Sequence, residues 1–117
     1  MSDLVVTLPL SFGLYRWIQE GDPAGEESSG EEWGWYVGGA RPACEAGDRL
    51  YVVHAGKLRG FAPVIRVATL RPGSHCIVRG GYAVAVTIPE RIPGFRGWRR
   101  RWWDREAEQP FPEWRTP

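Results

Sequence analysis

The side chains with the clearest potential for chemistry lie together near the end of the chain. Residues 98–103 read Trp-Arg-Arg-Arg-Trp-Trp, so three arginines and three tryptophans occupy six consecutive positions. Arginine carries a permanent positive charge on a planar fork of donors that fits a phosphate group or a base edge. Tryptophan offers a flat π face on which a nucleic-acid base can stack. The segment therefore indicates a nucleic-acid surface, although a helix that docks on a β-domain would need the same tryptophans.

A helix over residues 98–108 would divide these side chains between two faces. Positions four apart share a helix face, so we expect Trp98 and Trp102 to pack inward on the body. The side chains expected to face outward are Arg99, Arg100 and Trp103. The residues predicted to contact nucleic acid are Tyr15, His54, Lys57, Arg59, Arg96, Arg99, Arg100, Arg101 and Trp103.

These predicted contacts divide into two roles. Lys57 and the consecutive arginines of residues 99–101 are expected to contact phosphate groups. His54 stands at a strand end beside Lys57 and Arg59, where it could also touch a phosphate. Tyr15 and Trp103 are expected to stack on bases.

A second aromatic group lies in the first third of the chain and comprises Tyr15, Trp17, Trp33, Trp35 and Tyr36. Trp33 and Trp35 are two residues apart, so on a strand they share one face. Tyr15 lies off the apolar face of a predicted helix and is expected at the mouth of a pocket. The group forms either an aromatic wall for a base or part of an aromatic core.

Length and charge limit the classes of function. The 117 residues are enough for a single domain, with residues 94–117 expected to form a C-terminal helix and tail packed on its body. The formal net charge of +1 excludes a broad basic coat for duplex phosphates. The charges are segregated, however, because residues 20–32 hold acids without bases and residues 91–101 hold arginines without acids. A nucleic-acid role must therefore use a local patch.

Other kinds of chemistry find little support in the sequence. The two histidines and two cysteines lack the paired spacing of zinc ligands, so we expect no metal and no cofactor. No nucleophile with an adjacent base is visible. The acidic start of the chain does not resemble an export signal, and no apolar run is long enough for a membrane span. We therefore expect a cytoplasmic protein with free thiols and no membrane partner.

The pattern of apolar residues predicts a short strand and a helix at the start of the chain. Residues 4–8 form a buried strand, and Ser11 caps a helix that runs to about Glu20. Residues 24–32 show no periodicity and are expected to form a loop, followed by an aromatic strand at residues 33–37. The side chains expected on the core face of the helix are Leu10, Leu14, Trp17 and Ile18.

Two hairpins are predicted in the middle of the chain. Residues 49–54 and 58–67 form the first, with a bulge or a sheet edge expected at Pro63. Residues 76–79 and 82–88 form the second, joined by a two-glycine turn. Closely spaced antiparallel strands of this kind favour a small barrel of about six short strands, because closure removes exposed edges.

This order of elements resembles the PUA-like superfamily, which includes the ASCH and EVE branches. The resemblance covers roughly residues 4–88. It rests on the opening strand and helix, on the turn Gly47-Asp48 that leads into a strand, and on the return segment 56–64. It implies a mainly β (α+β) pseudo-barrel, here with a helix after the first strand and another near the C-terminus. It also implies RNA, single-stranded or structured, as the partner, often with one modified or flipped-out base.

One ASCH subgroup is similar to small amidohydrolases that act on acetylated cytidine with a lysine, a threonine and a glutamate. That subgroup's Gly-x-Lys-x-x-Glu-x-Arg pattern would follow the first helix, but residues 21–27 contain neither lysine nor arginine. No catalytic residues are therefore assigned. A cavity that gathers Lys57, Thr7 or Thr87, and a glutamate would favour this activity.

The prediction is a non-enzymatic RNA-binding module that uses a local Arg/Trp patch and recognises a modified base. The alternatives are the ASCH-type amidohydrolase and a protein-interaction domain. The last remains open because tryptophan and arginine also dominate protein interfaces. The sequence does not indicate an oligomeric state.

Overall fold

The computed structural model describes residues 2–11, 13–20, 32–80 and 83–116. The loop predicted at residues 24–32 falls almost entirely outside them. The elements in chain order are β1 (Leu4–Thr7), α1 (Leu14–Glu20), β2 (Glu32–Gly38), β3 (Arg49–His54), β4 (Lys57–Arg71), β5 (Ser74–Gly80), β6 (Val86–Thr87), β7 (Trp98–Arg100), the 3₁₀ helix η1 (Arg105–Ala107) and β8 (Gln109–Pro110).

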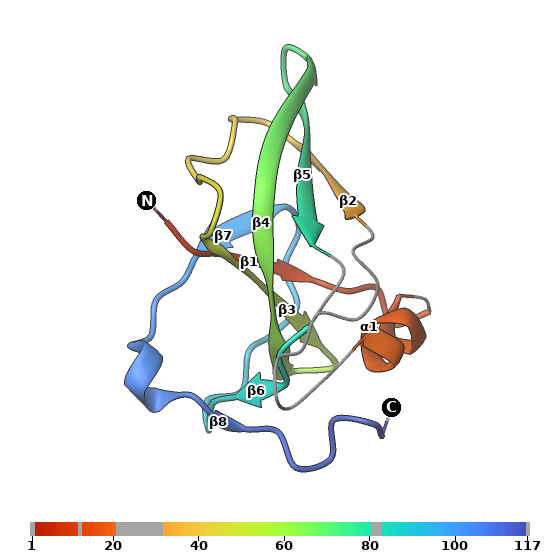
Figure 1. The fold of residues 1–117 in the computed structure, drawn as a ribbon, viewed down its shortest axis with the longest axis vertical. Coiled ribbons are helices and arrows are strands. Elements are labelled where there is room, and N and C mark those ends of the chain that lie inside the picture. The colour runs from red at the N-terminus through yellow and green to blue at the C-terminus, as the bar shows by residue number, and fades with distance from the viewer. Residues whose placement is uncertain (1, 12, 21–31, 81–82, 117) are drawn as a thin grey trace.

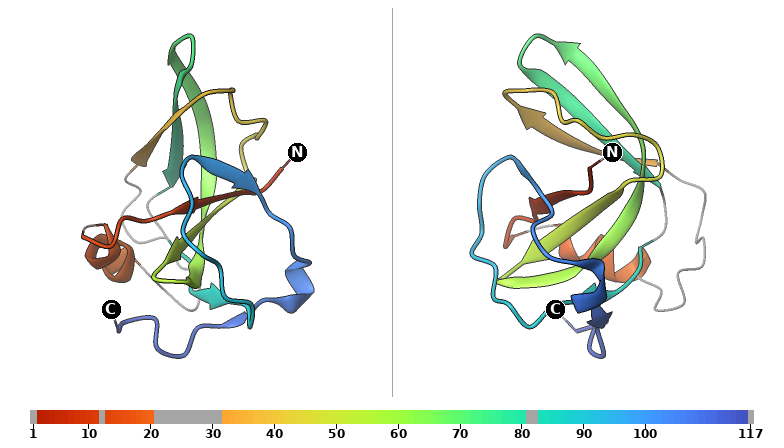
Figure 2. Two further views of the ribbon diagram at one scale, coloured as in Figure 1. Left: turned by 180° about the vertical axis from the view of Figure 1, so that it is seen from behind. Right: turned by 90° about the vertical axis from the view of Figure 1, so that its left-hand side faces the viewer.

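Six strands form one curled sheet in the order β2-β5-β4-β3-β1-β7, and β6 pairs separately with β8 (Figure 1). All neighbours are antiparallel except β1 and β3. Figure 2 shows how strongly the sheet bends. The indole N–H of Trp98 on β7 donates to the Ala40 carbonyl just beyond β2 at 3.4 Å, so the two outer strands approach each other. The predicted mainly β pseudo-barrel is confirmed.

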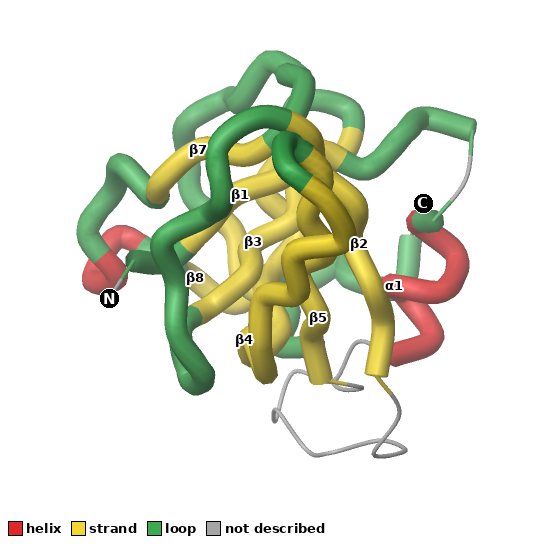
Figure 3. Tube along the Cα trace, turned by 90° about the horizontal axis from the view of Figure 1, so that it is seen from above, coloured by secondary structure: helices red, strands yellow, loops and turns green. Residues whose placement is uncertain are grey.

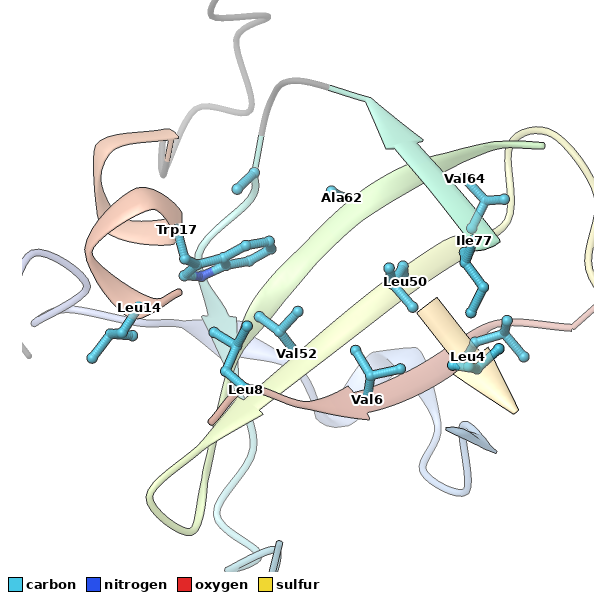
Figure 4. Close-up of a cluster of buried hydrophobic side chains, with 12 residues drawn as sticks. Leu4, Val6, Leu8, Leu14, Trp17, Leu50, Val52, Ala62, Val64 and Ile77 are labelled. Carbon is cyan, nitrogen blue, oxygen red and sulfur yellow. The ribbon is translucent and has the colours of Figure 1, made fainter. Parts of the chain in front are cut away.

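The core lies on both faces of β1 and β3, which explains their continuous apolar sequence. Successive side chains point to opposite faces of a strand, so β1 and β3 contribute to two clusters. The helix-side core, shown in Figure 4, contains Leu4, Val6, Leu8, Leu14, Trp17, Val37, Leu50, Val52, Ala62, Val64, Ile77 and Ala83. The tail-side core contains Val5, Tyr51, Val53, Leu58, Ile88, Ile92 and Trp103.

The predicted helix after the first strand is confirmed, but it is shorter than expected. It begins at Leu14 rather than at Ser11, because Gly13 takes a φ of +94°, outside helical geometry. Leu14 and Trp17 are buried as expected, whereas Leu10 lies before the helix and is exposed. Figure 3 shows α1 beside the open end of the curled sheet, next to β2.

The predicted helix over residues 98–108 is not formed. Its first part is strand β7, which pairs with β1 in the register Val5↔Arg99. Within the predicted range, only the three residues of η1 are helical. A helix of that length is marginal without docking, whereas pairing with β1 satisfies backbone donors and acceptors of both strands.

The two predicted hairpins have different outcomes. The hairpin of β3 and β4 is confirmed, and a bulge follows Pro63 directly, between Val64 and Arg66. The hairpin of residues 76–79 with 82–88 is not formed, because β2 and β4 already occupy both edges of β5. The chain after β5 pairs instead with β4, through a bridge between Val84 and Phe61, and with β8. The predicted turn falls partly outside the described residues.

Candidate nucleic-acid interface

An aromatic cavity of about 390 Å³ lies between α1 and the β2 edge of the sheet. Its aromatic walls are Tyr15, Trp17, Trp33 and Trp35. Four of the five residues in the second aromatic group therefore line one cavity. The fifth, Tyr36, does not line it and is 72% exposed. We refer to this feature as the aromatic cavity.

The local structure of α1 and β2 explains how these rings meet. Trp17 faces the helix-side core and is buried, as Figure 4 shows, whereas Tyr15 is 73% exposed at the cavity edge. Trp33 and Trp35 alternate with Gly34 on β2 and share one face. A Cβ atom on Gly34 would lie 2.8 Å from the Cys76 sulfur, so this glycine lets β2 pack tightly on β5.

Two arginines also line the cavity, and each guanidinium lies over one of its aromatic rings. The Arg16 guanidinium lies 4.6 Å from the Trp33 ring centroid. The Arg79 guanidinium lies 5.2 Å from the Trp17 centroid. Such contacts hold a guanidinium parallel or close to an aromatic surface and contribute about 0.5–1 kcal/mol each at exposed positions. The Trp33 indole N–H is buried and has no acceptor among the described residues.

The Arg/Trp segment forms a charged strand edge that does not border this cavity. Arg99 and Arg100 on β7 are exposed, and the Arg99 guanidinium lies 4.4 Å from the Phe95 ring centroid. Neither arginine has a carboxylate partner among the described residues. Arg96 is also exposed in the preceding segment. These arginines remain available to phosphate.

Trp98 is half-buried against the helix-side core, as expected, but the expected orientation is reversed for Trp102 and Trp103, because these residues do not form a helix. Trp103 is 7% exposed in the tail-side core, whereas Trp102 is 43% exposed. The Trp103 indole donates to Glu108, which also accepts from the Tyr51 hydroxyl. Burial raises the pKa of Tyr51, and its hydrogen bond to Glu108 raises it further. Trp103 is thus part of a buried hydrogen-bonded cluster and presents no free face to a base.

Two of the residues predicted to contact nucleic acid, Arg59 and Arg101, are engaged by other parts of the chain. The Arg101 guanidinium pairs with Asp3 at 2.9 Å. Arg59 is 5% exposed and donates to the carbonyls of Trp114 and Thr116. Burial lowers the pKa of Arg59. Both side chains hold the C-terminal segment on the sheet.

The remaining predicted residues lie around the β3–β4 turn. Lys57 is exposed and lines a second cavity of about 480 Å³, which we call the hairpin cavity. Thr87, Glu90, Arg91 and Glu113 line it as well. His54 is half-buried, and its Nε2 atom has no hydrogen-bond partner in the described part of the chain.

The predicted site residues therefore do not form a single surface. Tyr15 borders the aromatic cavity, Lys57 borders the hairpin cavity, and Arg99 and Arg100 stand on the β7 edge. Sequence reasoning missed Arg16 and Arg79 of the aromatic cavity and Arg91 of the hairpin cavity. The only signal for Arg79 is its cross-strand register opposite Trp33, which requires the pairing of β2 with β5.

The described residues contain no group of three or more His, Cys, Asp or Glu side chains that could hold a metal ion. Both ring nitrogens of His75 are engaged in hydrogen bonds, one with the Thr69 hydroxyl and the other with the Gly39 carbonyl. Among the same residues, no helix combines the length and apolar character needed to cross a bilayer.

Comparisons with known proteins leave the family open. No family model matches the chain. No match is found among curated proteins, and none among solved structures.

Proposed function

We propose that this protein is a non-enzymatic RNA-binding module of PUA-like type, which holds one base of the RNA in the aromatic cavity. The observation that carries the proposal is the convergence of four aromatic rings and two guanidiniums on one cavity. Flat aromatic rings bind a base by stacking, and guanidiniums stack on bases or pair with phosphates.

The charge distribution supports a ligand with few phosphate contacts. The chain is nearly neutral, so long-range attraction to a duplex is weak. Arg99 and Arg100 on β7 supply exposed positive charge for flanking phosphates. The choice of RNA rests on the resemblance of residues 4–88 to the PUA-like superfamily, while the aromatic lining of the cavity supports recognition of a base.

Replacing Tyr15 with alanine is expected to weaken binding of a labelled single-stranded RNA 12-mer by about fivefold to 150-fold, since stacking contributes roughly 1–3 kcal/mol per base. Thermal stability should change little because Tyr15 is 73% exposed. Fluorescence anisotropy at fixed low salt measures the affinity.

Tyr36→Ala is the matched control, because Tyr36 is a tyrosine of equal exposure that does not line the cavity. It should retain the affinity of the unmodified protein. Equal losses in the two variants, or no loss in Tyr15→Ala, would contradict base binding in the aromatic cavity.

The double substitution Arg99→Glu and Arg100→Glu is expected to reduce RNA affinity by at least about tenfold, because it replaces attraction to phosphate with repulsion. The folded state should be nearly unaffected, because neither side chain pairs with a carboxylate of the described residues. Filter binding over a salt series, with circular dichroism for stability, tests this. Unchanged affinity at low salt would remove β7 from the proposed surface.

A second candidate function, the amidohydrolase acting on acetylated cytidine, is favoured by one observation. Lys57, Thr87 and two glutamates line the hairpin cavity together. Incubation of the protein with acetylated cytidine, followed by chromatography of the products, tests this activity. Turnover that disappears in Lys57→Ala would establish it, whereas the absence of turnover would exclude this substrate.

A further inference from the structure

The hairpin cavity is built from three segments that are distant in the sequence. They are the turn between β3 and β4, the segment that follows β6, and the tail that follows β8. Ile88 and Phe111 are buried and form an apolar floor, and charged side chains stand around them. A cavity with an apolar floor and a charged rim fits a small ligand that has both a flat body and a charged group.

Two cations line this cavity without a salt-bridge partner among the described residues. Lys57 and Arg91 are exposed, and neither pairs with a carboxylate of the described residues. Arg91 packs on the hairpin turn, since a Cβ atom on Gly56 would lie 3.1 Å from its Nε. The adjacent Ile92 N–H donates to the Gly56 carbonyl at 3.0 Å. The turn and the following segment therefore hold Arg91 beside Lys57.

A third cation lies beneath the floor. The guanidinium of Arg59 is 4.5 Å from the centroid of the Phe111 ring, which lines the cavity. Arg59 donates only to backbone carbonyls, and its buried Nε has no acceptor among the described residues. The dipoles of these two carbonyls compensate the charge of the guanidinium only in part. Arg59 therefore adds positive potential behind the apolar floor.

The two acids of the cavity offset this potential only in part. The Glu90 carboxylate accepts from the exposed Trp102 indole at 3.0 Å, so one of its oxygens is already engaged. Glu113 is exposed and has no partner among the described side chains. The cavity and its floor therefore hold three cations and two carboxylates. The two exposed cations, Lys57 and Arg91, both lie at the turn between β3 and β4.

We propose that the hairpin cavity binds a phosphate monoester, with Lys57 and Arg91 at the phosphate and the apolar floor against the flat body of the ligand. A free mononucleotide and the 5′-phosphate end of an RNA both present this chemistry. The inference rests on the charge and shape of this cavity and is independent of base binding in the aromatic cavity.

Isothermal titration with uridine 5′-monophosphate, and with uridine as the ligand that lacks phosphate, tests the proposal. The monophosphate should bind at low salt and uridine more weakly. Lys57→Gln and Arg91→Gln should each weaken monophosphate binding by about threefold, and the double variant by about tenfold. Glu113→Gln should strengthen it, because it removes a like charge. Arg71→Gln is the control and should leave monophosphate binding unchanged, because Arg71 is an exposed arginine at the opposite end of β4 from Lys57 and lies outside the cavity.

Several results would overturn the proposal. They are equal affinity for uridine and its monophosphate, unchanged binding in the Lys57→Gln/Arg91→Gln variant, or an equal loss in Arg71→Gln. Tyr15→Ala separates the two sites, because it should retain monophosphate binding while it loses affinity for RNA. A 5′-phosphorylated oligonucleotide that binds more tightly than its 5′-hydroxyl form would assign the site to an RNA end. Equal binding of the two forms, with the mononucleotide effects intact, would assign it to a free nucleotide.

Discussion

Replacing Gly60 with alanine is expected to destabilise the folded state by about 3–5 kcal/mol, in the range reserved for severe core defects. A Cβ atom at this position would lie 2.2 Å from the Val84 carbonyl oxygen and 3.1 Å from the Trp17 ring. The φ angle of Gly60 is +143°, which disfavours any side chain. Urea denaturation followed by circular dichroism measures the free energy of unfolding.

The position of Gly60 in the sheet explains why the Val84 backbone cannot move away from an added side chain. Val52 pairs with Gly60 and Val53 with Leu58, so Arg59 is an extra bulged residue between them. Immediately after the bulge, the Phe61 N–H and C=O bond with Val84 at 3.0 and 2.8 Å. The clash is with backbone that is fixed by this bridge, and a shift of Val84 would break both hydrogen bonds.

Gly73→Ala is the control for the backbone conformation alone. Gly73 has a φ of +78°, and an added Cβ atom there would meet nothing within 4 Å. Gly73→Ala should therefore lower the free energy of unfolding only by the conformational penalty of roughly 1–2 kcal/mol. If Gly60→Ala lowers the free energy of unfolding no more than Gly73→Ala does, the Val84 backbone does not approach β4 as closely as described. The Trp17 ring also lies close to Gly60 and lines the aromatic cavity. That result would therefore also contradict the described position of Trp17 in the cavity.

The parts of the fold that could be predicted depend on contacts close in the sequence. The β3–β4 hairpin follows from two apolar runs and a tight turn, and α1 follows from Leu14 and Trp17 on one face. β7 could not be predicted, since its partner β1 lies more than ninety residues away in the chain. Charge and aromatic content favour a helix or a strand equally at Trp98–Arg100, and only the free edge of β1 decides.

The same limit applies to the candidate site. The aromatic residues Tyr15, Trp33 and Trp35 all lie in the first third of the sequence, and the structure places them around one cavity. The sequence could not indicate that Arg79 joins them, because that contact depends on strand order. Nor could it indicate that Arg101 is engaged, because its carboxylate partner is near the opposite end of the chain. Residue type identifies side chains suited to a ligand, but long-range pairing decides which of them are free.

The buried carboxylate of Asp3 ties the start of the chain to the Arg/Trp segment. Its side chain is 3% exposed and pairs with Arg101 at 2.9 Å and with Arg105 at 2.8 Å. It also accepts from the Arg49 N–H at 2.9 Å. In addition, the Arg101 N–H donates to the Asp3 carbonyl, which continues the pairing beyond β7. Arg101 is therefore a structural residue that anchors the segment carrying Arg99 and Arg100.

Asp3→Ala is expected to destabilise the protein by about 1–3 kcal/mol at neutral pH, because it removes the shared partner of two partly exposed arginines and the acceptor of the Arg49 N–H. Urea denaturation at pH 7 measures this loss. Glu32→Gln is the matched control, since the Glu32–Arg66 pair is exposed and should contribute little. A loss in Asp3→Ala no greater than that in the control would contradict the anchoring role.

The pH dependence of stability provides an independent test of the same carboxylate. Burial by itself would raise the pKa of Asp3, but hydrogen bonds from the Arg49 N–H, Arg105 and Arg101 outweigh it and hold the pKa below its ordinary value of 3.8. A carboxylate whose pKa is lowered on folding stabilises the folded state at pH values above its unfolded pKa. That contribution is lost as the pH falls through the lower, folded pKa. Asp3→Asn has no charge to lose, so its stability should fall less steeply than that of the unmodified protein below about pH 4. Parallel stability curves in acid would show that Asp3 is not the ionised anchor of this segment.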